Sequence, residues 1–242
     1  MIEIVEVIRR SEQGATRPYI CKGDNGKTYY VKGFDAGRRS LICEWIAGNL
    51  AKRIDLPIAP FEIAYVSDEL IAAAPAEYED LGTGEVFASL EIPATELSYS
   101  NISQVPQTLQ QDILVFDWWV RNGDRTLTEL GGNPNLLWEP SNKKVVIIDH
   151  NQAFDFDLDR KILLSSHVFG ESTRSLTSDF FRQDEYNKRL SKALENFDEI
   201  INQIPSSWLY ADQQQTVLID FDIEKAMKLV KDFSDKDFWT QS

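Results

Sequence analysis

The sequence predicts an α+β fold with two lobes, a small N-terminal β-sheet lobe with one helix and a mainly helical C-terminal lobe. Short segments of alternating apolar and polar residues fill positions 1–92, whereas apolar residues recur at helical spacing within 105–242. The chain has 242 residues, of which 43% are hydrophobic and 26% are charged, as expected of one substantial globular domain. Residues 93–104 contain no low-complexity linker, so we expect a hinge between lobes of one domain rather than a boundary between domains.

Five short strands and one helix are predicted in the N-terminal lobe. The segment Asp24-Asn25-Gly26 tolerates the positive φ of a tight hairpin, so it is predicted to join two strands. Between residues 38 and 53 apolar residues recur at helical spacing, which indicates an amphipathic helix packed on a small sheet. The predicted strands, chosen for their alternation and short length, are residues 2–9, 18–22, 27–32, 61–66 and 86–92.

The C-terminal lobe is predicted to be helical, with two short strands inserted. Residues 109–120 form a strongly apolar segment, residues 180–204 a long amphipathic one, and residues 223–233 a terminal helix. Strand-like segments at 135–138 and 144–148 lie between the first two helices.

Charge and composition exclude several classes of protein. The formal net charge of −14 gives a surface that repels nucleic-acid phosphates and anionic lipid, so we expect neither nucleic acid nor membrane as a partner. Basic residues concentrate near the N-terminus, which suits either an anionic ligand or a mixed-charge surface exposed to solvent. The N-terminal segment lacks the apolar stretch of a signal peptide, so we expect a cytoplasmic protein. Cys21 and Cys43 lack metal-binding spacing and are predicted to be buried.

A lysine and a glutamate form the first candidate pair for chemistry. Lys32 closes the second strand of the predicted hairpin, and Glu44 follows within the apolar helix. Taken singly, Lys32 suits a solvated strand end and Glu44 an ordinary helix-surface acid. Taken together, they suit a phosphate-binding ammonium group that a carboxylate orients.

The segment VRNGDR after the tryptophan-rich helix carries the second candidate, Asp124. An Asn-Gly-Asp sequence is also a common helix-ending turn. The functional alternative makes Asp124 the group that orients an attacking hydroxyl and accepts its proton. Asn133 and Asn135 stand just before a short apolar strand, where an amide oxygen can bind Mg²⁺.

The third candidate is Asp149, which follows four consecutive apolar residues in VVIIDHNQAFD. An acid at the end of a buried strand is costly unless it is paired or holds a metal ion. We therefore expect Asp149 to be the principal Mg²⁺ ligand. Along the chain the candidates follow as a lysine, a glutamate, an aspartate, an asparagine and a second aspartate. This order suits phosphoryl transfer, in which a protein positions and neutralises charge on phosphate oxygens.

These segments resemble those of the HipA-like kinase family, a branch of the protein-kinase-like superfamily. AGRRSLICEWIAGNLAKRIDLPIAP is similar to the family's Glu-bearing helix and following strand, NGDRT with NPNLLW to its catalytic loop, and IIDHNQAF to its metal-binding segment. The resemblance implies a two-lobed kinase fold in which Lys32 contacts phosphate, Glu44 pairs with it and Asp124 is the catalytic aspartate. It also implies that Asn135 and Asp149 hold Mg²⁺.

Other parts of the nucleotide site follow from the same resemblance. FASLEIP is similar to the family's hinge strand, which implies that Glu91 lies at the nucleotide. The loop after the first strand would cover the phosphates through the backbone of Gly14, Ala15 and Thr16, with Arg17 assisting. This loop lacks the GxGxxG pattern of protein kinases.

The sequence departs from the family at TLTELGG, which lengthens the stretch between Asp124 and Asn135. Asn135 must therefore loop back toward Asp124, and Asn133 is a rival metal ligand.

The predicted function is ATP- and Mg²⁺-dependent transfer of the γ-phosphoryl group to a hydroxyl, of Ser or Thr in a protein substrate. One alternative is a pseudokinase that binds nucleotide and acts as a protein-interaction module, as the sparse phosphate loop suggests. Another is a small-molecule or lipid kinase, although the acidic surface disfavours an anionic membrane substrate.

Overall fold

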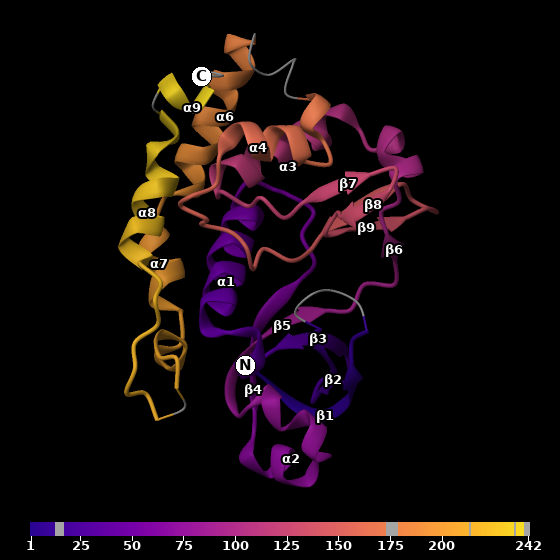
Figure 1. Ribbon diagram of the computed structural model, residues 1–242, viewed down its shortest axis with the longest axis vertical. Coiled ribbons are helices and arrows are strands. Elements are labelled where there is room, and N and C mark those ends of the chain that lie inside the picture. Colours follow the sequence, from indigo (N-terminus) through magenta and orange to yellow (C-terminus); the bar gives the residue numbers. More distant parts are fainter. Residues whose placement is uncertain (13–16, 173–178, 213, 235, 240–242) are drawn as a thin grey trace. The chain divides into compact units, whose positions relative to one another are not determined.

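The computed structural model describes residues 1–12, 17–172, 179–212, 214–234 and 236–239, and it divides into two compact units (Figure 1). Its mixture of strands and helices confirms the predicted α+β class. The predicted lobe limits, residues 1–92, 93–104 and 105–242, stay a prediction. Unit 1 consists of Met1–Trp45, Ala59–Ile92 and Ile201–Phe221, and unit 2 of Ile46–Ile58, Pro93–Ile200 and Asp222–Ser242.

Unit 1 contains a closed barrel of five strands in the order β1-β2-β3-β5-β4. Neighbouring strands are antiparallel except β1 and β4, which pair in parallel with Ile2 opposite Ala64 and so close the ring. All five strands were predicted, but the expected small sheet is in fact a barrel. Alternation within each strand does not indicate that the first strand lies beside the fourth. The strands are β1 Ile2–Arg10, β2 Tyr19–Gly23, β3 Thr28–Lys32, β4 Phe61–Val66 and β5 Gly84–Leu90.

The barrel interior is filled by inward-facing side chains from every strand. One end of the barrel is covered by α2 (Asp68–Ala73), which contributes Leu70 and Ile71 to the barrel core (Figure 1). This helix was not predicted, although Ser67 caps it by accepting a hydrogen bond from the Leu70 N–H at 3.2 Å. The core residues are Ile4, Tyr19, Cys21, Tyr29, Val31, Ala64, Val66, Leu81, Val86 and Ala88.

The predicted amphipathic helix is α1 (Arg38–Arg53), and its residues 41–47 are all buried. Both cysteines are buried and unbridged, Cys21 in β2 and Cys43 in α1, as predicted. Because α1 is buried on several faces, polar residues along it are held away from water. Their burial costs free energy unless each has a hydrogen-bond or ion-pair partner.

A segment from the C-terminal part of the chain completes unit 1. Trp208, in a 3₁₀ turn over Ser206–Leu209, is fully buried, and its indole Nε1–H donates to the Glu85 carbonyl oxygen at 2.8 Å. A buried tryptophan with a satisfied N–H contributes both apolar area and a directional contact. The segment Ile201–Phe221 is therefore an integral part of unit 1.

The core of unit 2 is built around α3 (Gln107–Trp119), the predicted tryptophan-rich helix. Trp118 and Trp119 are fully buried, and the Trp119 indole Nε1–H donates to the Val230 carbonyl oxygen of α8 (Ile223–Lys231) at 2.8 Å. Other helices among the described residues of this unit are α4 (Arg160–Ser166), α6 (Phe180–Ala193), α7 (Phe197–Asn202), whose last residues belong to unit 1, and α9 (Lys236–Trp239).

The predicted helix over residues 180–204 is interrupted and forms two helices, α6 and α7. Asn196 adopts a φ of 51°, and asparagine tolerates this left-handed conformation better than most residues. Helical periodicity continues across this break, so the apolar pattern alone could not indicate it.

The described residues of unit 2 also contain five short strands. The sheet β10-β9-β6 contains the two predicted strands; β9 is shifted by one residue toward the C-terminus of the chain, and β10 ends one residue earlier than predicted. The hairpin β7-β8 was not predicted. The strands are β6 Thr95–Glu96, β7 Thr126–Thr128, β8 Gly131–Asn133, β9 Leu136–Glu139 and β10 Lys144–Ile147.

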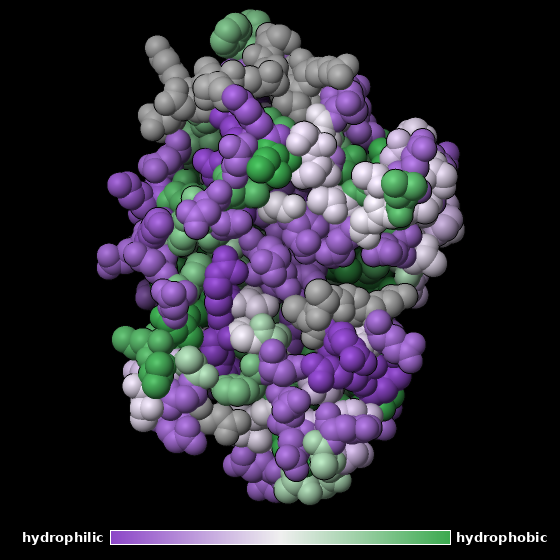
Figure 2. Space-filling model, viewed as in Figure 1, coloured by the Kyte–Doolittle hydropathy of each residue, from purple (hydrophilic) through white to green (hydrophobic). Residues whose placement is uncertain are grey.

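The face of the molecule drawn in Figure 2 is mainly polar. On the face shown in Figure 2 hydrophilic side chains predominate, and hydrophobic ones lie in small separate groups. Among the helices of the described residues, none combines the length and the apolar character needed to cross a bilayer.

Replacing Trp208 by alanine should lower the free energy of unfolding by about 3–5 kcal/mol, because it leaves a cavity in unit 1 and removes the hydrogen bond to Glu85. Urea denaturation followed by circular dichroism measures this loss. Phe181→Ala is the control, because Phe181 is 88% exposed and its loss should change the free energy by less than about 0.5 kcal/mol. Equal effects of the two substitutions would contradict the assignment of this segment to the core.

Candidate active site

Lys32 and Glu44 form a buried ion pair inside unit 1. Lys32 ends β3 and Glu44 projects from α1, and the distance from Lys32 Nζ to Glu44 Oε1 is 2.5 Å. The two side chains are only 8% and 3% exposed. Removing both charges from water costs about as much free energy as their mutual attraction returns. The pair is therefore weak evidence for a contribution to stability. The pair predicted from the sequence is thus present, with its lysine at the end of a strand.

The loop predicted to cover the phosphates is only partly described. Gly14, Ala15 and Thr16 lie outside the described residues. Arg17 is exposed, and its backbone carbonyl accepts a hydrogen bond from Arg10 Nε at 3.1 Å. The base of the loop closes where the Ser11 N–H donates to the Pro18 carbonyl at 2.8 Å. The predicted contacts of residues 14–17 with nucleotide stay a prediction.

Glu91 follows β5 directly and, with Ile92, ends the Ala59–Ile92 part of unit 1. Its side chain is exposed, and its backbone N–H donates to the Thr28 carbonyl oxygen at 3.0 Å. Glu91 thus lies at the end of a predicted strand, and both the hinge role of this strand and nucleotide binding by Glu91 stay predictions.

Asp124 and both candidate asparagines come together in unit 2. Asn133 Nδ2 donates to Asp124 Oδ2 at 2.7 Å, and Asn135 Nδ2 donates to the same oxygen at 3.1 Å. The lengthened stretch between them folds as the hairpin β7-β8, with Thr126 paired to Asn133. The hairpin returns the chain to Asp124, so the extra residues do not displace the asparagines.

A glycine is required where this hairpin returns. A Cβ atom on Gly132 would lie 2.5 Å from the Thr126 carbonyl oxygen, closer than any real contact. Gly131 has a φ of 114°, which a side chain rarely permits. The Gly-Gly pair in TLTELGG thus allows the insertion to close tightly.

The asparagines offer oxygen to a metal ion in similar ways. Because a carboxylate can only accept, each amide must turn its Nδ2 toward Asp124, which leaves Oδ1 as the ligating atom. Asn135 is buried and has a φ of 48°, whereas Asn133 is half-buried at the end of β8. Both stay candidates for the metal ligand.

A buried cluster centred on Asp117 lies beneath these residues. Asp117 is fully buried in α3, and its carboxylate accepts from Arg125 Nε at 2.6 Å and from Asn122 Nδ2 at 2.9 Å. His167 Nε2 lies 2.9 Å from Asp117 Oδ2. His167 Nδ1 accepts from the Phe169 N–H at 3.0 Å, so the proton is on Nε2, which donates to Asp117.

Arg125 joins three segments of the site through its remaining donors. Its Nη1 donates to the Asn135 carbonyl oxygen at 2.6 Å and lies 3.3 Å from the carbonyl oxygens of Pro134 and Ile148. The Ile148 N–H in turn donates to the Asn135 carbonyl at 3.1 Å. Arg125 therefore ties the loop of Asp124 to the asparagine turn and to the residue before Asp149.

Asp149 follows β10 as predicted, and it is half-buried rather than buried. Its φ is 55°, and its Oδ1 accepts from the Asn151 N–H at 3.3 Å. Left-handed backbone in a residue with a side chain is strained, and such strain is common at functional sites. Arg121, Asn135 and Phe154 share this conformation, with φ between 48° and 59°, so four such residues surround the site.

The donor set fits Mg²⁺ completed by phosphate oxygens. It offers one carboxylate on Asp149 and an amide oxygen on Asn133 or Asn135, all hard oxygen ligands. Within the described part of the chain no group of three or more His, Cys, Asp or Glu side chains is placed to hold a metal ion. Mg²⁺ commonly binds through one or two carboxylates plus substrate phosphates, which agrees with so sparse a set.

Three residues of this cluster were not predicted from the sequence: Asp117, Asn122 and His167. A signal for Asp117 was present, because the apolar stretch ILVFDWW contains this single acid. Burying an unpaired acid within an apolar stretch is costly at Asp117 just as it is at Asp149. His167 lies far along the chain and carries no comparable signal.

Two pKa shifts follow from the burial of this cluster. Burial by itself raises the pKa of Asp117, but the charge of Arg125 and the His167 contact outweigh it and hold that pKa well below the usual range. Burial lowers the pKa of His167, and the hydrogen bond to Asp117 only partly opposes this. Asp117 is therefore ionised and His167 neutral at pH 7.

Stability should fall as the pH drops from 7.5 to 5.5. The pKa of His167 is lower in the folded chain than in the unfolded chain, so the unfolded state binds more protons over this interval. Proton binding stabilises the unfolded state relative to the folded state, and the free energy of unfolding falls. His167→Gln keeps a donor for Asp117 and should show a smaller loss between these two pH values in urea denaturation. An unchanged pH dependence in this variant would contradict the assignment of a neutral buried His167.

Replacing Arg125 by methionine should lower the free energy of unfolding by about 3–5 kcal/mol, because it leaves Asp117 buried without a cation. Adding Asp117→Asn should restore part of the loss, because the uncompensated charge disappears. The control is Lys188→Met, which breaks an ion pair whose side chains are 75% and 64% exposed and should therefore change the free energy of unfolding far less. A similar small loss for Arg125→Met would show that the buried pair does not organise the site.

A solved kinase structure shares this fold. The proinflammatory kinase CtkA of Helicobacter pylori superposes with a TM-score of 0.53 at 14% sequence identity, over 95% of this chain and 97% of CtkA. A Golgi casein kinase with Mn/ADP bound superposes with a TM-score of 0.48 at 12% identity, over 95% of this chain and 70% of that kinase. At 14% identity the likeness to CtkA shows a kinase fold and nothing finer.

Sequence comparison identifies the family. No curated protein matches the chain. The model of the family described as HipA-like kinase matches residues 4–242, nearly the whole chain. The resemblance found in the motifs is thereby confirmed: the chain belongs to the HipA-like kinase family.

Proposed function

We propose that this kinase transfers the γ-phosphoryl group of ATP, in a Mg²⁺-dependent reaction, to the hydroxyl of Ser or Thr in a protein. The observation that carries the proposal is the convergence of Asn133 and Asn135 on Asp124, with Arg125 tying them to the backbone before Asp149. Membership of a kinase family supports the reaction class. The acceptor class rests on the resemblance in the motifs.

Asp124 is the residue that would orient the acceptor hydroxyl and accept its proton. Two amide donors fix the position of its Oδ2, so the carboxylate presents its lone pairs in a defined direction. Orientation supplies much of the rate in phosphoryl transfer, because the reacting oxygens must stand in line.

Asp149 and one of the two asparagines would hold the metal ion. Mg²⁺, when bound, neutralises charge on the β- and γ-phosphates and fixes their orientation. The left-handed backbone at Asp149 and Asn135 is held by hydrogen bonds around Arg125, so these side chains are placed before any ligand arrives.

Lys32 would contact the α- and β-phosphates. Glu44, at 2.5 Å, keeps the ammonium group in place and balances its charge within unit 1. Arg17, the backbone of residues 14–16 and Glu91 complete the proposed nucleotide contacts. A point charge on phosphate and a carboxylate that orients it are the roles these residue types fill in kinases.

Asp124→Asn and Asp149→Asn should each reduce phosphate transfer by at least about 100-fold, since each removes a charged group that acts on the reacting atoms. Purified protein with labelled ATP and Mg²⁺ measures the rate of autophosphorylation or of ATP turnover. The matched control is Asp157→Asn, which removes the same charge from an exposed site nearby in the chain and should leave the rate unchanged.

Analysis of the labelled product tests the acceptor in the same experiment. Phosphoserine or phosphothreonine is expected, and label that passes only to a small molecule would contradict a protein acceptor. Turnover that is equal in wild type and both site variants would contradict the catalytic assignment. A rise in melting temperature with ATP and Mg²⁺ but no turnover would instead support a nucleotide-gated binding module.

A further inference from the structure

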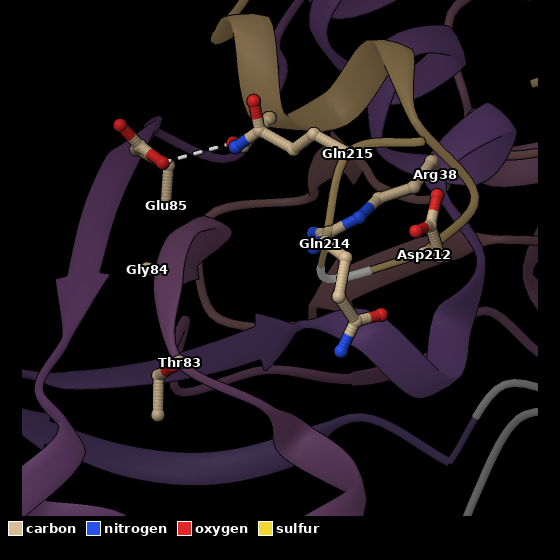
Figure 3. A pocket seen from close by; sticks show the side chains of 8 residues that line it. Arg38, Thr83, Gly84, Glu85, Asp212, Gln214 and Gln215 are labelled. Atoms are coloured by element: carbon tan, nitrogen blue, oxygen red, sulfur yellow. Dashed lines mark hydrogen bonds between the residues drawn. The ribbon is translucent and has the colours of Figure 1, made fainter. Parts of the chain in front are cut away.

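Unit 1 contains a polar cavity of about 400 Å³ that none of the roles above uses. Arg38 at the start of α1, Thr83 and Glu85 around the start of β5, and Ser207 and Gln214 of the C-terminal segment line it (Figure 3). Its volume lies within the range of sites for small ligands.

Arg38 is a buried cation that lines this cavity. The residue is 8% exposed, and its guanidinium carbon lies 5.1 Å from the centre of the Phe34 ring. No described residue accepts a hydrogen bond from its guanidinium, and its Nε is fully enclosed. Burial lowers the pKa of Arg38, and the nearby charge of Glu85 opposes this. A buried guanidinium beside a cavity, with no acceptor among the described residues, indicates a ligand that accepts hydrogen bonds.

The two acids of the cavity have different surroundings. Asp212 accepts from the N–H groups of Thr216 and Val217 and from the Thr216 hydroxyl, so its carboxylate is directed at its own loop. Glu85 Oε2 accepts from the Ser207 hydroxyl at 2.9 Å, which leaves its other oxygen for a ligand. Figure 3 shows the Arg38 guanidinium directed into the cavity and Glu85 on its other side.

Gly84 keeps the space beside Glu85 open. A Cβ atom at this position would meet nothing within 4 Å, and the φ of 96° restricts the position to glycine. The cavity therefore presents a planar cation on one side and a single available carboxylate on the other, with room for a few heavy atoms between them.

We propose that this cavity binds a small zwitterion of the α-amino-acid class, with its carboxylate on Arg38 and its ammonium group on Glu85. A carboxylate matches the fork of a guanidinium in two parallel hydrogen bonds. The N-terminus of α1, where Arg38 stands, also favours a negative group. A phosphate dianion fits less well, because Glu85 and Asp212 would repel its second charge.

Isothermal titration of the full chain, without nucleotide, tests this site. The probes are the individual L-amino acids, with acetate, methylammonium and inorganic phosphate as probes that carry only part of the proposed chemistry. At least one amino acid should bind with one-to-one stoichiometry and at least about tenfold more tightly than any of the three partial probes, a difference of about 1.4 kcal/mol.

Variants locate the binding. Arg38→Gln and Glu85→Gln should each weaken it at least about tenfold, and the second keeps an acceptor for Ser207, so folding is retained. Arg9→Gln removes the same charge from an exposed position on β1 and should have no effect. The proposal is wrong if no amino acid binds at about 10 mM, if acetate or phosphate binds as tightly, or if Arg38→Gln binds like wild type. These outcomes do not depend on whether the chain transfers phosphate.

Discussion

The buried ion pair between Arg125 and Asp117 is the interaction on which the candidate active site depends. A guanidinium carries five N–H donors in one plane, so this single side chain satisfies a carboxylate and reaches three backbone carbonyl oxygens. Those carbonyls belong to the asparagine turn and to the residue before Asp149. Burial of two charges gives little net stability compared with a well-packed apolar pair. We therefore infer that the role of the pair is to fix the backbone positions of Asp124, Asn135 and Asp149.

The two units prepare their charged groups by different means. In unit 1 the closed barrel and α1 enforce the contact between Lys32 and Glu44, so the pair follows from the packing of regular elements. In unit 2 the groups stand on irregular backbone, and several of the surrounding residues have left-handed φ values. Such backbone is stable only when neighbouring contacts define it fully. The hydrogen bonds of Arg125, together with the cap that the Phe154 N–H makes on the Val120 carbonyl at 2.7 Å, supply these contacts.

How much could be predicted from the sequence depended on whether the determining contacts are local. Strand alternation and helical spacing are local, so the five barrel strands, α1, α3 and the Lys32–Glu44 pair were predicted well. Closure of the barrel depends on β1 meeting β4, and the break before α7 depends on one left-handed asparagine, so neither was visible in the periodicity. The hairpin that returns Asn133 and Asn135 to Asp124 depends on two glycines inside the apparent insertion. His167 reaches Asp117 across 50 positions, and no pattern in one sequence indicates such a pair.

A structure of the chain with Mg²⁺ and a non-hydrolysable ATP analogue tests the account most directly. We expect Asp149 and one of the two asparagines to bind Mg²⁺ at about 2.1 Å, the usual distance for this ion. Lys32 should lie at hydrogen-bond distance from the α- or β-phosphate, with Glu44 still in contact with it. The backbone around Arg125 should be unchanged, because the hydrogen bonds of Arg125 arrange it before the ligand binds. Phosphates more than about 6 Å from Lys32, Asp149 and both asparagines would contradict the proposed site.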